Sequence, residues 1–378
     1  MYRVNSIAMI FVGWMLVGPV LLAQPSPDTW AVSRGDASSH GASSSKIANH
    51  PKLLWEYKNE KTAFDSTPII VTGRVFIGDL DGEFYAIELA TGNALWKTES
   101  ESGFVAAAAY RDEKLVIGDY DGLVRCLNAK DGTEVWQFKT GAQIDGGANF
   151  YRDSVLVTSE DGCLYALNFS DGELKWKYET GDQLRCSPTV ADNRTFLAGC
   201  DGKLHIVDLD LGTRVGEGFP LDGPTGSTPA SQGDLAIAPT LSGAVFLFNW
   251  KASKRLWTFE DKERSQEIRS SPAIDDQFIF VATRNRRLLA LDMSTGNLAW
   301  EYLMKKRSDA SPIVCDGRVW IGASDGRIYA LDVKTGKEVW QAEQPGAFSA
   351  SAAIAEGKLV VASDKGSIYC YGESTPIQ

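Results

Sequence analysis

The stretch from Asp325 to Trp340, DGRIYALDVKTGKEVW, is one copy of a repeat that organises most of the 378-residue chain. Closely similar copies run from Asp81 to Trp96, from Asp121 to Trp136 and from Asp161 to Trp176. Successive copies start 40 to 43 residues apart, and the four weaker ones start at Asp201, Ser242, Asn285 and Lys365. A period near forty residues with four short apolar runs is typical of a β-propeller. The repeat therefore predicts an all-β, eight-bladed β-propeller of four-stranded blades.

Each part of the repeat has an expected place in a blade. The Asp-Gly pair, as in Asp325-Gly326, predicts a tight turn because both residues tolerate positive φ. Ser-Pro, as in Ser311-Pro312, predicts the start of a strand, since proline lacks an amide donor. A tryptophan ends most periods, and its recurrence at one position favours docking of each blade on the next over a ligand platform. The docking tryptophans are Trp55, Trp96, Trp136, Trp176, Trp257, Trp300 and Trp340.

The N-terminal stretch PKLLWEYKNE has the register of a last strand that lacks its blade. Trp55 lies 41 residues before Trp96, whereas the three expected strands between Phe348 and Tyr371 lack a fourth. We expect the N-terminal strand to complete the C-terminal blade, which closes the ring without a free sheet edge. The propeller is expected over residues 51–372, with a tail over residues 373–378. Gly216 stands where the fourth blade should have its tryptophan and predicts a remodelled outer strand.

The first residues predict export. Arg3, the uncharged apolar run from Ile7 to Leu22 and the small residue Ala23 indicate a signal peptide over residues 1–23, with an uncleaved anchor as the alternative. The Ser- and Gly-rich residues 24–50 are expected to form a flexible leader. We therefore expect the mature protein in the periplasm or outside the cell.

Charge and cysteine content restrict the function further. The net charge of −11 argues against nucleic-acid binding, which requires a basic surface. Six cysteines occur without an adjacent pair, and Cys186 and Cys200 flank an expected hairpin. In an oxidising compartment these two form either a disulfide or two separate thiols. The three histidines, His40, His50 and His205, are too few and too scattered in the sequence to indicate a metal cluster.

The pattern DGxxYALDxxTGxxxW, the Ser-Pro strand starts and the closing terminal strand resemble the pyrroloquinoline-quinone-like (PQQ-like) propeller repeat. The resemblance covers residues 51 to 372, and the leader from Trp30 to Gly41 is also similar to that of secreted members. The wider family includes quinoprotein dehydrogenases and BamB-like outer-membrane assembly factors. The copy number and length resemble the second group. Because no cysteine for a lipid anchor follows the apolar run, membrane association is expected only through the N-terminal segment or a partner.

The resemblance implies a non-catalytic, monomeric scaffold that binds a protein partner, such as an outer-membrane assembly complex. The alternative is a propeller that binds a small ligand or a quinone, either as a sensor or as a PQQ-dependent dehydrogenase. The quinoprotein enzymes that this family includes typically carry adjacent cysteines, which are missing here. Asp79 with Asp81 and Asp119 with Asp121 supply only fragments of a calcium loop. Neither PQQ nor calcium is therefore expected as a cofactor.

The candidate binding site is the mouth of the central channel. If the Ser-Pro strand is innermost, the residue two positions before the Ser or Thr faces the channel entrance once in each blade. Five of the eight residues at this position are charged, with both signs present: Asp65, Asp145, Arg185, Arg269 and Asp309. This ring predicts a recognition surface for a peptide or small ligand, with a solvated polar funnel as the alternative.

Overall fold

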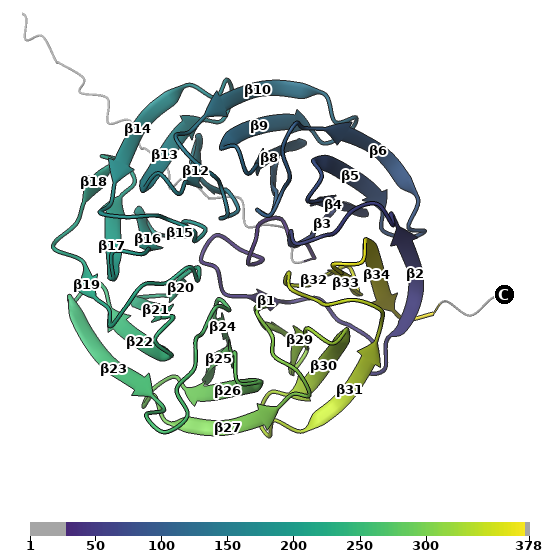
Figure 1. Cartoon of the computed structure of the whole chain (residues 1–378). Helices are drawn as coiled ribbons and strands as arrows, with labels where there is room; N and C mark the ends of the chain where they lie inside the picture. The colour runs from purple at the N-terminus through teal and green to yellow at the C-terminus, as the bar shows by residue number, and fades with distance from the viewer. Residues whose placement is uncertain (1–27, 375–378) are drawn as a thin grey trace, which may run out of the picture.

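The computed structural model describes residues 28–374, which form eight blades arranged around a central axis (Figure 1). The repeat strands of each blade pair antiparallel with their neighbours, and one added N-terminal strand, β1 (Ala42–Ser43), pairs parallel with an inner strand. Among the described residues, no helix is long and apolar enough to cross a membrane. The all-β, eight-bladed propeller predicted by the repeat is thus confirmed. The predicted signal peptide over residues 1–23 lies outside the described residues, as do the last residues of the predicted tail, 375–378.

The first four blades follow one another along the chain, each from its innermost to its outermost strand. Blade 1 consists of β3 (Ile69–Val71), β4 (Arg74–Gly78), β5 (Glu83–Glu88) and β6 (Ala94–Glu99). Blade 2 consists of β7 (Ala109–Arg111), β8 (Lys114–Gly118), β9 (Leu123–Asn128) and β10 (Glu134–Lys139). Blade 3 consists of β11 (Asn149–Tyr151), β12 (Ser154–Thr158), β13 (Cys163–Asn168) and β14 (Leu174–Glu179). Blade 4 consists of β15 (Thr189–Ala191), β16 (Arg194–Ala198), β17 (Lys203–Asp208), β18 (Thr213–Arg214) and β19 (Phe219–Pro220).

The other four blades repeat this order, and two of them include N-terminal strands. Blade 5 consists of β20 (Ala230–Gln232), β21 (Leu235–Pro239), β22 (Ala244–Asn249) and β23 (Lys254–Glu260). Blade 6 consists of β24 (Ala273–Ile274), β25 (Phe278–Thr283), β26 (Arg287–Asp292) and β27 (Leu298–Leu303). Blade 7 consists of β28 (Ile313–Cys315), β29 (Arg318–Gly322), β30 (Arg327–Asp332) and β31 (Glu338–Glu343), joined by β1 (Ala42–Ser43). Blade 8 consists of β32 (Ala353–Ala355), β33 (Lys358–Ala362), β34 (Ser367–Gly372) and β2 (Lys52–Lys58).

The N-terminal strand closes the ring. β2 pairs antiparallel with β34 along its whole length, with Trp55 opposite Cys370 and Lys58 opposite Ser367. Figure 1 shows this purple strand on the outside of the yellow C-terminal strands. The predicted completion of the last blade by the first strand is confirmed. Pairing in this way leaves no edge of blade 8 open to another chain.

Residues 28–50 differ from the flexible leader expected over residues 24–50, because they pack around the inside of the ring. Trp30 exchanges two backbone hydrogen bonds with Ile70 of blade 1, and later leader carbonyls accept from inner-strand amides. The acceptor–donor pairs are Ala31–Tyr110, Ala37–Val190, Ser38–Ser231, His40–Ile274 and Gly41–Val314. The purple trace therefore crosses the centre of Figure 1 before it reaches β2. Low hydrophobicity indicated disorder, but backbone hydrogen bonds and one aromatic anchor order this segment.

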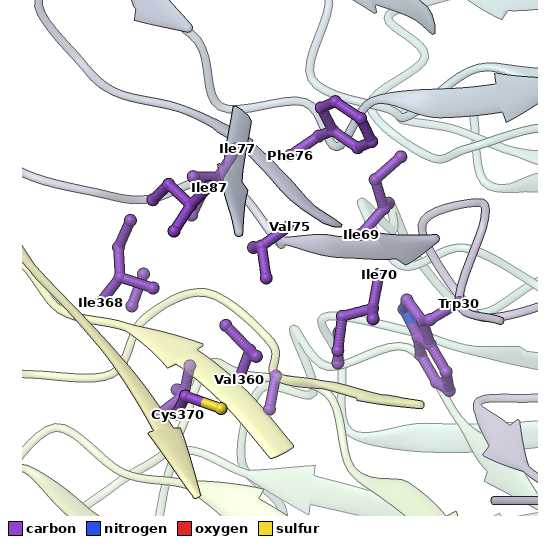
Figure 2. Close-up of a cluster of buried hydrophobic side chains, with 14 of the residues drawn as sticks. Trp30, Ile69, Ile70, Val75, Phe76, Ile77, Ile87, Val360, Ile368 and Cys370 are labelled. Carbon is purple, nitrogen blue, oxygen red and sulfur yellow. The ribbon is translucent and has the colours of Figure 1, made fainter. Parts of the chain in front are cut away.

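Trp30 joins the leader to the hydrophobic core. Its side chain is fully buried beside Ile70 of blade 1 and close to blade 8 (Figure 2). Val360 and Cys370 of blade 8 belong to the same cluster, which also contains Phe76 of blade 1. The first and last blades are thus held together by a leader residue as well as by β2. Burying an indole of this size contributes a large apolar area to that seam.

Six of the seven outer-strand tryptophans dock on a glycine of the next blade, whereas Trp340 packs edge-on against Tyr371 of blade 8 at 5.6 Å. The indole nitrogen of Trp96 donates to the carbonyl of Ala129 at 3.1 Å, and Trp300 donates to Val333 at 2.9 Å. A Cβ added at Gly132 or Gly336 would lie 2.7 or 2.6 Å from the corresponding indole ring. The turn glycine of the repeat is therefore required by the neighbouring tryptophan as well as by its own positive φ.

The seam between blades 4 and 5 is packed by a tryptophan of blade 5 rather than of blade 4. Blade 4 lacks the tryptophan, and its outer strand is split into β18 and β19, in line with the remodelling that Gly216 predicts. Trp250 of blade 5 reaches back instead and packs edge-on against Phe196 at 5.6 Å. Because no indole arrives from blade 4, Ser253 occupies the turn position that is glycine elsewhere.

Candidate functional site

The ring has two faces, and the candidate site lies on the one opposite the leader. We call this the mouth face; it consists of the connections between blades and the turns between second and third strands. Hydrogen bonds from Leu80 N to Ala63 O and from Phe104 N to Asp79 O join these segments. The leader bonds to the inner strands nearer their hairpin ends. The leader therefore occupies the channel on the side away from the mouth face.

Arg34 of the leader lies buried between the inner strands. Its Nη2 atom donates to the carbonyls of Pro272 and Pro312 at 3.1 and 2.7 Å, at the starts of the inner strands of blades 6 and 7. Burial lowers the pKa of the Arg34 guanidinium to about 10, against a smaller opposing effect of Asp36. The arginine therefore ties the leader to two blades by charge-assisted hydrogen bonds.

The Ser-Pro and Thr-Pro strand starts link neighbouring blades around this channel. The amide of Ser187 donates to the hydroxyl of Thr228 at 3.0 Å, and the amide of Thr228 donates to Ser271 at 2.9 Å. The same bond joins Ser271 to Ser311, and Ser311 to Ser351. The sequence indicated a strand start from the proline alone. The hydroxyl next to it adds a row of hydrogen bonds that joins blades 4 to 8 in succession.

Two of the five mouth residues, Asp145 and Arg185, meet through a third residue that the sequence reading missed. Nε of Arg185 lies 2.9 Å from a carboxylate oxygen of Glu160. Glu160 also shares a hydrogen bond with Asp145, which in turn accepts from Gln143 Nε2 at 2.5 Å. Burial, and after it this contact with Asp145, raises the pKa of the Glu160 carboxyl. The result is one connected network over blades 3 and 4.

Arg269 and Asp309 are likewise brought together through intermediates. Arg284 donates to both oxygens of Asp309, at 2.9 and 3.1 Å, and also contacts Glu267 at 3.2 Å. Glu267 accepts from Arg269 Nε at 3.1 Å. The hydrogen bonds to Asp309 raise the pKa of the Arg284 guanidinium. Blades 6 and 7 therefore carry a second network, separate from the first.

Asp65 stands apart from both networks, close to the ends of blades 1 and 8. Its side chain is open to the mouth, yet the protein around it displaces water on one side. This desolvation, with smaller effects of Asp309 and Asp145, raises the pKa of the Asp65 carboxyl, and a hydrogen bond with Ser349 opposes the shift. The five predicted residues therefore ring one mouth without converging on a single point.

The residues that connect the networks come from a position the sequence reading did not use. Glu160 and Arg284 each stand two residues before the last residue of the turn between the second and third strands. In the repeat this place directly precedes the Asp-Gly pair, so it can be located in every blade by alignment of the copies. A second position in each repeat that faces the mouth is the sequence signal by which these residues could have been found.

The charged side chains of the mouth are paired with one another. Calcium requires six to eight oxygen ligands. Within residues 28–374, no group of three or more His, Cys, Asp and Glu side chains is arranged to hold a metal ion. The carboxylates at the mouth are engaged by arginines instead: Glu160 by Arg185, and Asp309 by Arg284.

The surface hollows are open. The larger, of about 770 Å³, lies on the mouth face between blades 6 and 7 and is lined by charged residues including Arg284, Arg286, Lys306 and Arg307. The other, of about 570 Å³, lies between blades 5 and 6 on the opposite face. The cysteines at 186 and 200, adjacent to the mouth of blade 4, are separate thiols.

Comparison with known proteins gives both a family and a fold. A family model described as outer membrane protein assembly factor BamB matches residues 48–144, 120–260 and 242–373. No match is found among curated protein sequences. BamB from Moraxella catarrhalis has a similar structure, with 17% identity and a TM-score of 0.73 over 87% of this chain and 99% of that chain.

Other solved structures share the fold with different functions. Quinohemoprotein alcohol dehydrogenase from Comamonas testosteroni has 14% identity and a TM-score of 0.77, over 93% of this chain and 82% of that chain. The computationally designed Ika8 protein has 16% identity and a TM-score of 0.74, over 85% of this chain and 100% of that chain. At these identities the likeness concerns the fold alone, since one propeller architecture serves unrelated functions.

Proposed function

Because this chain belongs to the family of the outer membrane protein assembly factor BamB, we propose that it acts as a protein-interaction scaffold rather than as an enzyme. Its partner would belong to an outer-membrane assembly complex, and the chain would act as a monomer. The family match across all blades, from residue 48 to residue 373, carries this proposal. Export to the periplasm or beyond is proposed on the same ground and on the apolar N-terminal sequence.

The geometry of the mouth face supports a macromolecular partner. Small-molecule sites are concave, mostly apolar and largely closed. The hollow on this face is open and lined entirely by polar residues, among them three arginines, one lysine and one aspartate. A stiff disc that displays charged loops presents a broad surface, and loops on a rigid scaffold are where binding residues concentrate.

The experiment is affinity capture of the tagged mature chain from detergent-solubilised cell envelope, followed by identification of the retained proteins. We expect recovery of outer-membrane assembly proteins above a control in which charged surface residues are scrambled. Equal recovery by the two proteins would refute the scaffold proposal. The capture should be repeated at raised salt, since a charged interface weakens as ions screen it.

The quinone-binding alternative rests on the fold shared with quinohemoprotein alcohol dehydrogenase. It predicts that added PQQ and calcium bind together and support the reduction of a dye by an alcohol. A ligand sensor predicts instead that charge reversal at Arg185 and Arg269 abolishes ligand binding without altering the melting temperature. The scaffold proposal predicts neither quinone binding nor dye reduction.

A further inference from the structure

One turn of the mouth face breaks the pattern of all the others. The last residue of the turn between the second and third strands is glycine with positive φ in seven blades: Gly82, Gly122, Gly162, Gly202, Gly243, Gly326 and Gly366. In blade 6 this residue is Arg286, at a φ of 72°. A long side chain in the left-handed region strains the backbone, and such strain is typical of functional positions. Ten non-glycine residues of the described chain have a positive φ, and Arg286 is the one that lies on a mouth-face turn between second and third strands.

The arginine belongs to a group of exposed cations. Arg286 on the turn of blade 6 faces the connection from blade 6 to blade 7, which carries Lys305, Lys306 and Arg307. We call Arg286, Lys305, Lys306 and Arg307 the basic lobe. The side chain of Arg286 makes one recorded hydrogen bond, a long one of 3.4 Å from Nη1 to the carbonyl of Lys305. Arg286, Lys305 and Lys306 form no ion pair with any carboxylate of the described residues, and Arg307 lies 4.0 Å from Asp309.

The basic lobe lines a hollow and contrasts with the rest of its face. The hollow of about 770 Å³ brings together Arg286, Lys306 and Arg307 with the paired Arg284. In blades 1 to 4 the residue before the turn glycine is an aspartate: Asp81, Asp121, Asp161 and Asp201. The turns of blades 1 to 4 thus each carry a carboxylate, whereas the hollow gathers four cations around Asp325, which is itself paired with Arg327.

We propose that the basic lobe is a docking site for an acidic segment of a protein partner, and this proposal rests on the scaffold function proposed above. Arginine and lysine side chains with unused donors bind carboxylates through charge-assisted hydrogen bonds. An extended segment with several Asp or Glu residues fits the hollow between blades 6 and 7. A flat anionic membrane would also lie against the turns of blades 1 to 4, where Asp81, Asp121, Asp161 and Asp201 repel it. These four aspartates favour a short acidic peptide, which reaches the hollow alone, over a lipid surface.

The test measures binding of a fluorescein-labelled octaglutamate peptide by fluorescence anisotropy, with the mature chain and three variants. In Arg286→Gly the turn receives the residue that seven blades use, so the fold is kept or stabilised while one donor group is lost. Losing a hydrogen-bonded charge pair weakens binding about tenfold. Lys305→Glu with Lys306→Glu should weaken it further. The matched control, Lys334→Glu with Lys337→Glu, makes the same change of net charge on the opposite face. Its affinity for the peptide should stay within about twofold of that of the unaltered chain, since salt screens charges that lie far from the bound peptide.

Lower affinity of Arg286→Gly at equal or higher melting temperature supports a binding role, because a merely structural arginine would lower stability when removed. Equal weakening by the control variant, or no saturable peptide binding by the unaltered chain, would overturn the proposal. Binding to phosphatidylserine vesicles that depends on the basic lobe, without binding of the peptide, would also overturn it in favour of a membrane.

The same variants separate this proposal from the scaffold function. If envelope capture succeeds equally with the unaltered chain and with Lys305→Glu, Lys306→Glu, the scaffold stands and the basic lobe is refuted as its docking site. If the peptide binds with the expected dependence on the basic lobe while capture retains no assembly protein, the scaffold proposal fails and the acidic-segment site stands.

Discussion

Replacing Gly336 by alanine tests the account of how the blades are joined. Gly336 has a φ of 66°, and an added Cβ would lie 2.6 Å from two atoms of the Trp300 ring. Gly317 in the same blade has a similar φ of 72°, but nothing lies within 4 Å of its added Cβ. The two substitutions therefore share the backbone strain and differ in the clash with the indole.

The expected magnitudes follow from these two contributions. An alanine in the left-handed region costs about 1 kcal/mol, which both variants lose. Forcing a methyl group into a packed contact costs about 1–3 kcal/mol more, which only Gly336→Ala loses. Trp300 cannot move freely, since its indole nitrogen donates to the Val333 carbonyl at 2.9 Å. We expect the free energy of unfolding to fall by about 1 kcal/mol for Gly317→Ala and by about 2–4 kcal/mol for Gly336→Ala.

The assay is urea denaturation followed by tryptophan fluorescence and by circular dichroism, with agreement between the two probes as the check on two-state behaviour. The reasoning is refuted if the two variants lose the same stability, because the glycine would then serve only its own φ. Changing Trp300 to leucine in the Gly336→Ala background provides the converse check. Removing the ring should make the added methyl group less costly than it is beside tryptophan.

Three further predictions concern the seam, the leader and the mouth. Trp250→Ala should destabilise the chain by about 3–5 kcal/mol in urea denaturation, since it removes the contact with Phe196 and the hydrogen bond to Gly233 O. If Trp250→Ala loses less stability than Leu211→Ala, a control at an exposed site, Trp250 does not hold blades 4 and 5 together. A chain that starts at residue 51 keeps β2 but loses the buried Trp30, and should melt well below one that starts at residue 28; equal melting temperatures would show that the leader does not support the ring. Asp65→Asn should raise the melting temperature at pH 7, because a raised pKa means that the folded state disfavours the ionised carboxyl. That advantage should shrink as the pH falls through the raised pKa towards the unfolded value near 3.8, and a gain that persists at lower pH would contradict the titration argument.

The repeat made the fold predictable because each copy states the same local structure. The turn residues, the strand starts and the outer-strand tryptophan recur in most copies. Because turn geometry, strand boundaries and packing all indicate the same blade, together they specify one architecture. The position of Trp55 relative to Trp96 even indicated which strand closes the ring. Sequence could locate these features because they depend on neighbours within about one period of the chain.

Features that depend on contacts between distant segments could not be read in this way. Residues 28–50 look polar and small, yet their backbone groups bond to the inner strands of most blades in turn. The local composition of such a segment does not indicate which hydrogen-bonding groups its backbone will meet in the folded protein. The mouth networks were missed for the same reason: Asp145 was found, but Glu160, which joins it to Arg185, lies in another turn.

Departures from the repeat carry different meanings, which only the neighbouring contacts can separate. Ser253 replaces a turn glycine where the indole that would require glycine is missing, so packing explains the change completely. Arg286 replaces a glycine on the mouth face, where the other seven blades keep it, and no packing contact accounts for its side chain. Both residues have a positive φ, of 52° at Ser253 and 72° at Arg286, so backbone strain alone does not separate them. Charge and position separate them: Arg286 lines an open hollow of the mouth face together with Lys306 and Arg307, and this is why the basic lobe, rather than the remodelled blade 4, is where we expect the partner to bind.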